Sequence, residues 1–296
     1  MGNDIRKRPL RVIALLATYN EERFVGGCIE HLAGQGVDVH LLDNESTDQT
    51  VARAQAYLGC GLMDIEVLPR GGEFSLTKIL ERKQELAATL DADWFMHHDA
   101  DEIRIGPRSG RRLVDALSDV DAAGFNAVNF REFTFVPTVE APDHDHARFT
   151  QTMRHYYPFL PEFPHRLNAW KRQSEPVDLA SSAGHKVAFA GLRMFPESFR
   201  MRHYLFLSRA HACEKYAGRT RSEAEMQQQW GGWRTTLAQR LTAGAGPALD
   251  LPRQDELRAY AGDDQLDAAR PLTAHVWSAT WARRLSAARD RTECNE

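Results

Sequence analysis

Short apolar runs alternate with helix-like apolar spacings along residues 10–135. Residues 10–17 form a nearly continuous apolar run, which is typical of a strand buried on both faces. Val25, Ile29 and Leu32 then recur at helical spacing, and a capping box of Ser46 and Gln49 marks the start of a later helix. The same reasoning predicts further strands at residues 37–42, 65–68, 94–96 and 125–130, and helices at 47–58, 79–90 and 113–117.

Strands that alternate with helices predict an α/β fold with a mostly parallel sheet flanked by helices, because parallel strands need crossover connections. The alternation stops after Phe133, where a polar loop and an aromatic, proline-rich stretch begin. Further strands are predicted at residues 167–171 and 186–189, and helices at 209–218 and 223–241. Residues 244–252 are rich in Ala, Gly and Pro, and we interpret them as a linker to a helical C-terminal extension.

Three of the predicted strands end in polar residues. Thr18 to Glu22 follow the first strand, Asp43 and Asn44 follow the second, and Asp99 to Glu102 follow the strand at 94–96. In open parallel sheets the loops after the strands gather at one edge, where ligands bind. We therefore expect these polar residues to form one site.

The acidic motif at residues 97–102, His-His-Asp-Ala-Asp-Glu, carries the clearest chemical signal. In an extended segment, residues two apart point to the same side, so Asp99 and Asp101 would face a common point. Two carboxylates held that close favour a cation between them, and hard oxygen ligands suit Mg²⁺ or Mn²⁺. The alternative is a solvated acidic turn.

The composition narrows the classes of partner and compartment. The chain has 296 residues with 37 basic and 41 acidic side chains, and this balance argues against a nucleic-acid-binding protein. Four scattered cysteines without a C-x-x-C pair predict reduced thiols and a cytoplasmic location. No apolar run approaches the ~20 residues of a membrane span, and no signal peptide is predicted. The basic start of the chain is interpreted as a solvated tail, with a peripheral contact to an anionic membrane surface as the alternative.

Taken together, these motifs resemble the family 2 glycosyltransferases of the GT-A fold, which are inverting enzymes that use nucleotide-activated sugars. The resemblance rests on Ala-Thr-Tyr-Asn-Glu at 17–21, Leu-Asp-Asn-Glu-Ser-Thr-Asp-Gln-Thr at 42–50 and Asp-Ala-Asp-Glu at 99–102, in this order and spacing. Later pieces, Ser-Ala-Gly-His at 182–185, Arg-His-Tyr at 202–204 and Gly-Trp at 232–233, look like a bacterial branch of that family.

The resemblance implies a division of the chain. It makes residues 10–135 the nucleotide-sugar-binding half of a Rossmann-like domain and residues 136–241 the acceptor-binding half. Residues 1–9 are then a basic tail, and residues 242–296 are the linker and helical extension. The oligomeric state is not predicted.

The resemblance also implies roles for individual residues. A nucleotide-sugar donor, with a preference for uridine, would contact Asp99 and, as a cation, Lys83. It would also contact residues that follow the first two predicted strands, namely Thr18, Tyr19, Glu21, Asp43 and Asn44. An Mn²⁺ or Mg²⁺ ion would bind Asp99, Asp101 and a histidine, for which His203 is the first choice and His185 the second. The alternatives are a salt-bridged surface lysine for Lys83, a strand-ending turn for Asp43 and Asn44, and a hydrogen-bonded core residue for His203.

The reaction that the resemblance implies is a single displacement at the sugar by an acceptor hydroxyl, with a saccharide or glycan precursor as the expected acceptor. The base would be an Asp or Glu of the second half, with Asp178 as first choice and Glu175 and Glu132 as others, although Asp178 could equally cap a turn. Aromatic residues at 156–163 with Trp170 would stack on acceptor sugars or form core. Arg219, Arg221 and Glu225 would bind an anionic acceptor or link turns of a helix.

Three other interpretations stay open at this point. A sugar nucleotidyltransferase would carry a glycine-rich phosphate loop where this chain has Thr-Tyr-Asn-Glu, and a phosphohydrolase would carry an aspartate nucleophile there. A non-catalytic sugar-nucleotide-binding protein would keep Asp43 and Asp99 and lack a base. His144 and His146 with their neighbouring aspartates could form a second metal site, and a solvated loop is favoured instead.

Overall fold

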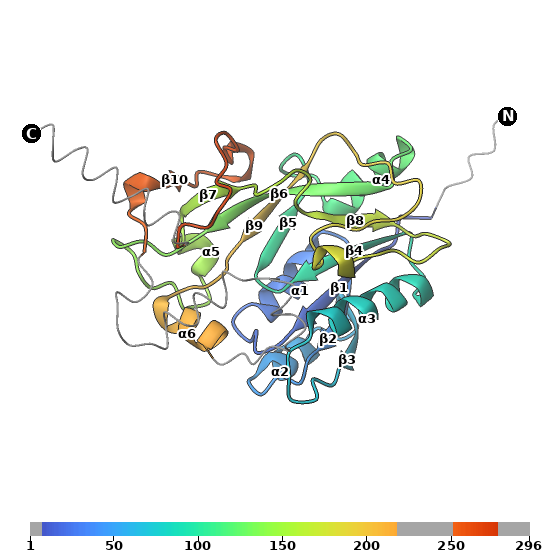
Figure 1. Cartoon of the computed structure of the whole chain (residues 1–296), viewed down its shortest axis with the longest axis horizontal. Helices are drawn as coiled ribbons and strands as arrows, with labels where there is room; N and C mark the ends of the chain where they lie inside the picture. The colour runs from blue at the N-terminus through green and yellow to red at the C-terminus, as the bar shows by residue number, and fades with distance from the viewer. Residues whose placement is uncertain (1–7, 218–250, 278–296) are drawn as a thin grey trace, which may run out of the picture.

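The computed structural model describes residues 8–217 and 251–277, and within these ranges ten strands form one mixed sheet (Figure 1). The strands are β1 (Val12–Thr18), β2 (Asp38–Asp43), β3 (Leu62–Val67), β4 (Trp94–Asp99), β5 (Glu102–Ile105), β6 (Ala127–Phe135), β7 (His155–Phe159), β8 (Leu167–Lys171), β9 (Phe199–His203) and β10 (Arg258–Ala259). The α-helices are α1 (Val25–Gly34), α2 (Thr50–Gln55), α3 (Leu76–Thr89), α4 (Leu113–Ala122), α5 (Phe149–Thr152) and α6 (Arg209–Ala217). Short 3₁₀ turns lie at Ala180–Ser182, Gln254–Glu256 and Asp263–Gln265.

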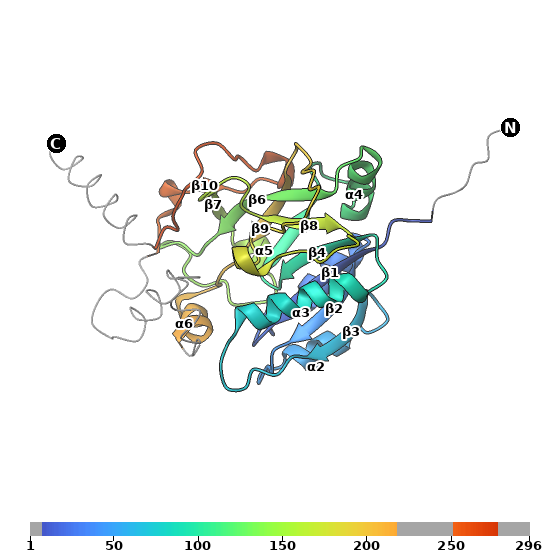
Figure 2. The same ribbon diagram turned by 45° about the vertical axis from the view of Figure 1, so that its right-hand side comes forward.

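The first half of the chain forms the predicted parallel layer. β3, β2, β1 and β4 lie side by side in that order, and every pair among them is parallel. β1 is buried on both faces because its side chains alternate between two cores. Val12, Ala14 and Leu16 pack with α1 and α4, whereas Ile13 and Leu15 pack with α3. Helices therefore cover both faces, and the α/β Rossmann-like fold class is confirmed (Figures 1 and 2).

The second half of the sheet is mainly antiparallel, which the sequence did not predict. β8 pairs antiparallel with both β4 and β6, β7 pairs antiparallel with β6, and β10 extends β7. β7 and β8 lie on either side of β6 and both run antiparallel to it, so they are parallel to each other without being neighbours. These directions are set by pairing between segments that are far apart in the chain, such as β8 with β4, and the local apolar pattern does not encode such pairing.

A small antiparallel pair positions the acidic motif. β4 ends at Asp99, the chain turns at Ala100 and Asp101, and β5 begins at Glu102. β5 pairs with β9, and this register sets Glu102 opposite His203. β9 in turn pairs with β6, so the turn is fixed to the second half of the sheet.

Several predicted element boundaries are corrected. α2 is limited to Thr50–Gln55, and Ser46 is not its cap because the Ser46 hydroxyl accepts the Asn20 N–H at 3.0 Å instead. Residues 186–189 make only isolated bridges and no strand. Residues 251–277 contain 3₁₀ turns and β10 rather than an α-helix, because Pro252, Gly262 and Pro271 interrupt them. The predicted helix at 223–241 and the rest of the extension lie outside the described residues, as does the basic tail up to residue 7.

A third apolar cluster attaches α6 to the body of the protein. Ala212 and Tyr216 of α6 pack with Leu205 and Phe206, which follow β9, and with Trp277. The Tyr216 hydroxyl donates to the Leu205 carbonyl at 3.2 Å. These contacts fix the position of α6, which matters for the site described below.

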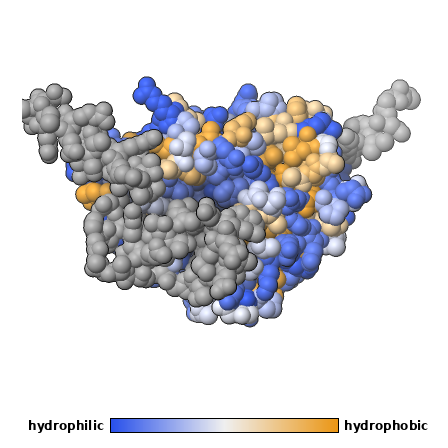
Figure 3. Space-filling model, in the orientation of Figure 1, coloured by the Kyte–Doolittle hydropathy of each residue, from blue (hydrophilic) through white to orange (hydrophobic). Residues whose placement is uncertain are grey.

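Hydrophilic residues cover most of the coloured face in Figure 3, in keeping with an apolar interior. Among residues 8–217 and 251–277, no helix combines the length and apolar character that a bilayer crossing requires. Cys28, Cys60 and Cys213 are free thiols, and Cys294 lies outside the described residues.

Leu15→Ala tests the central place of β1 in this fold. Leu15 of β1 is fully buried in the apolar cluster that β1 forms with α3, so its truncation removes apolar contacts and leaves a cavity. We expect a loss of about 2–5 kcal/mol in the free energy of unfolding, measured by equilibrium denaturation in urea. Leu58→Ala is the matched control, since Leu58 is 48% exposed and its truncation should change stability by about 0.5 kcal/mol or less. Equal losses in the two variants would contradict the assigned core.

Candidate functional site

A cavity of about 100 Å³ lies at the carboxyl ends of β1, β2 and β4. Its wall includes seven residues that the sequence analysis selected: Thr18, Tyr19, Glu21, Asn44, Lys83, Asp99 and Asp101. The polar ends of three parallel strands thus meet at one place, as the sheet topology requires. The wall also contains residues that the sequence analysis did not select, among them Phe74, His97, Lys215 and Tyr216.

The loops after β1 and β2 are joined by side-chain hydrogen bonds. The Asn20 side-chain oxygen accepts the Thr47 N–H at 2.8 Å, and the Thr50 hydroxyl accepts the Glu21 N–H at 2.8 Å. Asn20 has a positive φ of 56°, a conformation that asparagine tolerates better than most residues. This cross-linking holds Tyr19 and Glu21 against the cavity.

Asp43 lies behind the cavity wall and is only 2% exposed. Its carboxylate accepts the Thr18 hydroxyl at 3.3 Å and the Ser46 N–H at 2.9 Å. The neighbouring Asn44 does line the cavity, and its side-chain amide donates to the Leu68 carbonyl at 2.8 Å. Asp43 therefore supports the orientation of Thr18 in this structure.

Asp99 and Asp101 both line the cavity, but a turn rather than an extended strand brings them there. The side chain of Asp99 is 43% exposed, whereas that of Asp101 is only 8% exposed. Burial raises the pKa of Asp101, but the charges of Lys215 and His203 outweigh it and hold this pKa far below its usual range. The third carboxylate of the motif, Glu102, points elsewhere and pairs with buried Arg104 at 2.7 Å.

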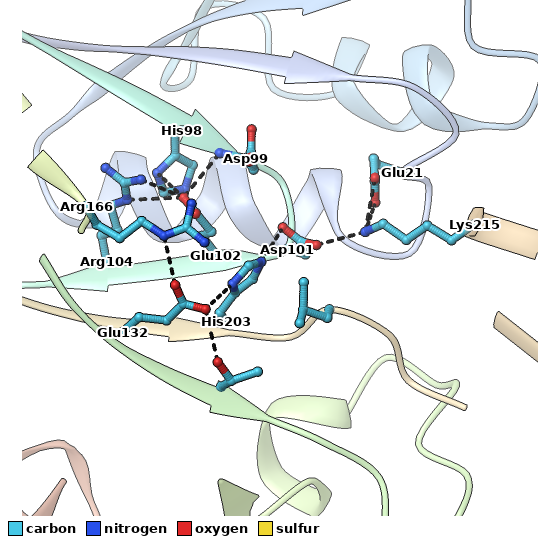
Figure 4. A network of polar contacts seen from close by, with 12 residues as sticks. Glu21, His98, Asp99, Asp101, Glu102, Arg104, Glu132, Arg166, His203 and Lys215 are labelled. Carbon is cyan, nitrogen blue, oxygen red and sulfur yellow. Dashed lines mark hydrogen bonds and ion pairs between the residues drawn. The ribbon is translucent and has the colours of Figure 1, made fainter. Parts of the chain in front are cut away.

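A chain of ionic contacts runs from α6 through Asp101 to β6 (Figure 4). The Lys215 ammonium lies 2.8 Å from Asp101 Oδ2 and 3.2 Å from the carboxylate of Glu21. On the other side of Asp101, Oδ1 is 3.5 Å from His203 Nε2. His203 Nδ1 in turn lies 2.7 Å from Glu132 Oε1. All three carboxylates of this network, Glu21, Asp101 and Glu132, are therefore paired with basic side chains from other segments.

Glu132 completes the network as a fully buried carboxylate. Its other oxygen accepts a hydrogen bond from Arg166 Nε at 2.8 Å, and Thr134 donates to Oε1 at 3.0 Å. Because Glu132 does not line the cavity and its oxygens are engaged, it orients His203 rather than facing a ligand.

Lys83 reaches the same cavity from α3 with a side chain that is fully buried. Its ammonium lies 3.1 Å from His97 Nδ1 and donates to the His98 carbonyl at 3.2 Å. Burial lowers the pKa of Lys83 to about 8, against the opposing charges of Asp99 and Glu102. A surface salt bridge, the alternative given for Lys83, is excluded by this burial.

The predicted metal ligands suit an ion that is coordinated partly by the protein and partly by water or substrate phosphates. In the described part of the chain, no three His, Cys, Asp or Glu side chains converge as a metal-binding set. Asp101 and His203 do lie side by side, and Glu132 behind His203 is the kind of outer partner that fixes a metal-binding imidazole. Mg²⁺ is commonly held by one or two protein groups together with water and substrate phosphates. The donor set therefore suits such an ion and not a closed protein cage.

Asp178, the first choice for the base, is not brought to this cavity. Its carboxylate accepts the Ser181 N–H at 3.0 Å, and hydrogen bonds from the Ser181 side chain and from this N–H lower its pKa. Asp178 therefore makes the contacts of a residue that caps a turn, which was the alternative to its role as the base. Glu175 is exposed, and His185 packs its ring against His165 at 4.9 Å, so neither adjoins Asp101.

Most of the aromatic residues proposed for acceptor stacking are core residues. Tyr156, Tyr157, Phe159 and Trp170 are each no more than 7% exposed, and they belong to the apolar clusters of the interior. Phe163 is the exception, since it is 60% exposed in the segment between β7 and β8. Arg219, Arg221 and Glu225 lie outside the described residues.

The loop with His144 and His146 is packed against the protein at His144, which is 5% exposed. The backbone N–H of His144 donates to the Leu207 carbonyl at 2.8 Å. Its Nδ1 lies 3.0 Å from the Thr152 hydroxyl, and Asp145 pairs with Arg23 at 2.8 Å. These contacts already occupy the groups that a second metal site would have used.

A second cavity of about 580 Å³ adjoins the first, and both share Ala100 and Asp101 in their walls. Aromatic rings of Tyr204 and Tyr260 line it together with Arg202. Its walls come from α1, β5 and the segments around residues 147–154 and 260.

Lys215 is the main residue that the sequence analysis missed. It lies 114 residues after Asp101 in the chain and on a helix whose pattern gives no sign of a site. Only the packing of α6 against the third apolar cluster brings its ammonium to the cavity. A sequence signal that could have revealed it is absent.

Residues 14–103 match the model of glycosyl transferase family 2. The match runs from β1 into β5 and contains all seven of the predicted residues in the cavity wall. His203, Lys215 and Asp178 lie beyond it. A comparison with curated proteins gives no significant match.

Several solved structures show distant similarity to this chain. TarS of S. aureus (residues 1–349, in complex with UDP) aligns with a TM-score of 0.42 and 13% identity over 83% of this chain and 77% of that one. The galactosyltransferase LgtC in complex with donor and acceptor sugar analogues gives 0.29 and 13% over 55% and 58%. A mycobacterial protein gives 0.28 and 22% over 43% and 42%. At these scores the similarities support no argument about donor, acceptor or mechanism.

The charge of His203 predicts a pH dependence of stability. Burial lowers its pKa, but Glu132 and Asp101 outweigh burial and raise it from 6.5 to about 10. His203 therefore binds its proton more tightly in the folded state, so its stabilising contribution is complete below pH 6.5 and is lost as the pH rises towards 10.

We expect the difference in unfolding free energy between wild type and His203→Gln to shrink between pH 6.5 and pH 10 in EDTA. Urea denaturation at several pH values measures it. Glutamine keeps a hydrogen-bond donor for Glu132 and does not titrate, so the comparison isolates the charge. A difference that is constant across this range would show that His203 is not protonated in the fold.

Proposed function

We propose that this protein is a glycosyltransferase that moves a sugar from a nucleoside-diphosphate sugar, preferably with uridine, to a hydroxyl group of a saccharide or glycan precursor. One observation carries the proposal. Seven residues that lie inside the segment matching glycosyl transferase family 2 line a single cavity at the carboxyl edge of the parallel strands. Proteins of this topology commonly bind their ligands at that edge.

The charges of the cavity support a diphosphate ligand accompanied by cations. Its wall carries the carboxylates Glu21, Asp99 and Asp101 and the ammonium groups of Lys83 and Lys215. A diphosphate adds further negative charge, which a divalent cation between Asp101 and the phosphates would offset. Thr18, Tyr19 and Asn44 are then left for the nucleoside, with Asp43 holding Thr18 in position.

The proposed reaction is one displacement with inversion at the sugar. The acceptor oxygen forms a bond to the anomeric carbon while the bond from that carbon to the diphosphate oxygen breaks. The electron pair of the broken bond leaves with the nucleoside diphosphate, and the hydroxyl proton passes to a carboxylate. A bound Mg²⁺ or Mn²⁺ would stabilise the charge that develops on the diphosphate. Asp101 would hold this ion together with His203, which would release the proton that it carries in the metal-free fold. Lys83 and Lys215 would add positive charge.

A non-catalytic sugar-nucleotide-binding protein is the second candidate function. It is favoured by the position of Asp178, which the structure keeps at the Ser181 turn and away from the cavity. Binding alone needs no base, so the two candidates differ in turnover and agree in donor affinity.

A thermal-shift screen of nucleoside diphosphates and their sugars with Mn²⁺, Mg²⁺ or EDTA tests donor binding. A ligand that binds only the folded state stabilises it by about 2.7 kcal/mol at a concentration 100 times its Kd. We expect one nucleoside diphosphate to raise the Tm, and to raise it more when a divalent cation is present. No shift from any compound under any metal condition would contradict the proposed function, and binding without sugar transfer would favour the second candidate.

Asp101→Ala tests the role assigned to the acidic turn. We expect this variant to lose the metal-dependent part of donor binding, measured by isothermal titration in Mn²⁺ and in EDTA, because the ion loses its carboxylate. Asp178→Asn is the matched control, since this carboxylate lies outside the cavity and donor binding should match that of wild type. Donor binding by Asp101→Ala at wild-type strength in Mn²⁺ would rule out the metal assignment. A loss of turnover in Asp178→Asn would restore Asp178 as the base.

A further inference from the structure

The Lys215 ammonium pairs with two of the three carboxylates that line the cavity. It contacts Asp101 at 2.8 Å and Glu21 at 3.2 Å, and the three side chains are at most 10% exposed (Figure 4). It also lies 5.1 Å from the ring centre of Phe24. Lys215 is therefore a desolvated cation on the wall of a ligand cavity and not a surface lysine.

α6 holds this ammonium in place through contacts with both halves of the fold. Ser208 begins the helix and its hydroxyl accepts the His211 N–H at 3.1 Å, while Tyr216 is fixed to the Leu205 carbonyl. Glu214 pairs with Arg23 at 2.8 Å, which ties the outer side of α6 to the loop before α1. The backbone of Lys215 is thus anchored independently of the contacts made by its ammonium.

The side chain itself can change partners. A lysine is a compact charge on a flexible four-carbon stem, so its ammonium can turn from one anion to another without movement of the helix. Lys83 differs, because its ammonium is held inside the core by His97 and the His98 carbonyl. Of these two lysines, Lys215 is therefore the one suited to exchange a carboxylate for a phosphate.

A diphosphate in this cavity would compete with Asp101 for the ammonium, and a divalent cation would compete with the ammonium for Asp101. Both exchanges favour the same rearrangement. The ion would pair with the Asp101 carboxylate as well as with the phosphates, and the ammonium would pair with phosphate oxygens through charge-assisted hydrogen bonds.

We propose that Lys215 is a donor-binding residue whose ammonium leaves Asp101 and Glu21 and pairs with the diphosphate of the nucleotide sugar, while a divalent cation takes its place at Asp101. This inference rests on the proposed function and names the contact that holds the leaving group. Before the donor binds, the same ammonium offsets part of the negative charge of the two carboxylates.

Isothermal titration of the full chain with UDP, uridine and inorganic pyrophosphate in Mg²⁺ tests this contact. Lys215→Met should weaken the binding of UDP and of pyrophosphate about tenfold or more, as expected for the loss of a hydrogen bond between charged groups. Uridine lacks phosphates, and its affinity should not change. Lys215→Arg keeps the charge and should retain part of the affinity for UDP.

Two control variants separate the ammonium from other effects. Lys171→Met removes an exposed lysine that lies opposite Trp94 at the start of β4, at the far end of the strand from the cavity, and should bind UDP like wild type. Glu214→Gln loosens α6 from Arg23 but keeps the ammonium, and should leave the preference for UDP over uridine unchanged. Equal weakening of UDP and uridine in Lys215→Met would instead indicate a structural role for the helix and overturn the proposal.

Mn²⁺ binding in the absence of nucleotide provides the second readout. Removal of the competing ammonium should let Lys215→Met bind Mn²⁺ at least as tightly as wild type, as measured by the free-ion signal in electron paramagnetic resonance. Weaker Mn²⁺ binding would show that Lys215 supports the ion site and would overturn the exchange. If wild type binds UDP and Lys215→Met binds it equally well, only this inference fails. If wild type binds neither UDP nor pyrophosphate, the proposed function fails with it.

Discussion

The compensation of buried carboxylates by cations from distant segments is the constraint on which this site depends. Asp101 faces Lys215 of α6 and His203 of β9, and Glu132 of β6 faces His203 and Arg166. An unpaired charge at such positions would cost several kcal/mol, because desolvation in the interior is not offset by water. The fold can therefore bury the turn after β4 only if β9 and α6 are in place. The first half of the chain provides the cavity, and the second half provides the charges that make it stable.

The parts of the fold that could be predicted from sequence are those that depend on local pattern. β8 was predicted with its observed bounds and β1 and α1 nearly so, because their apolar spacing reflects burial against immediate neighbours. The antiparallel addition of β7 and β8 was not predicted, since the pairing of strands depends on connections and partners that local pattern does not encode. The start of α2 was misplaced because Ser46 bonds Asn20 of another loop instead of capping its own helix.

The candidate site divides along similar lines. Thr18, Asn44, Asp99 and Asp101 could be selected because each lies at or just after the end of a strand of the parallel layer. Topology alone brings such positions together. Lys215 could not be selected, because its place depends on the packing of Tyr216 and Ala212 against residues that are far away in the chain. Asp178 was selected from its neighbourhood in sequence, and a local hydrogen bond to Ser181 accounts for it. Residues near the motif were thus predictable, whereas residues that arrive through tertiary packing were not.

The size of the cavity has a consequence for how much of a ligand it can enclose. At about 100 Å³ it is smaller than the roughly 300–1,000 Å³ that small-molecule pockets usually offer. A ligand as large as a nucleotide sugar would therefore extend beyond this cavity. The adjoining cavity of about 580 Å³ shares Ala100 and Asp101 with it, so a ligand that spans both would pass directly over the acidic turn. The paired charges of that turn would then face the middle of the bound molecule rather than one of its ends.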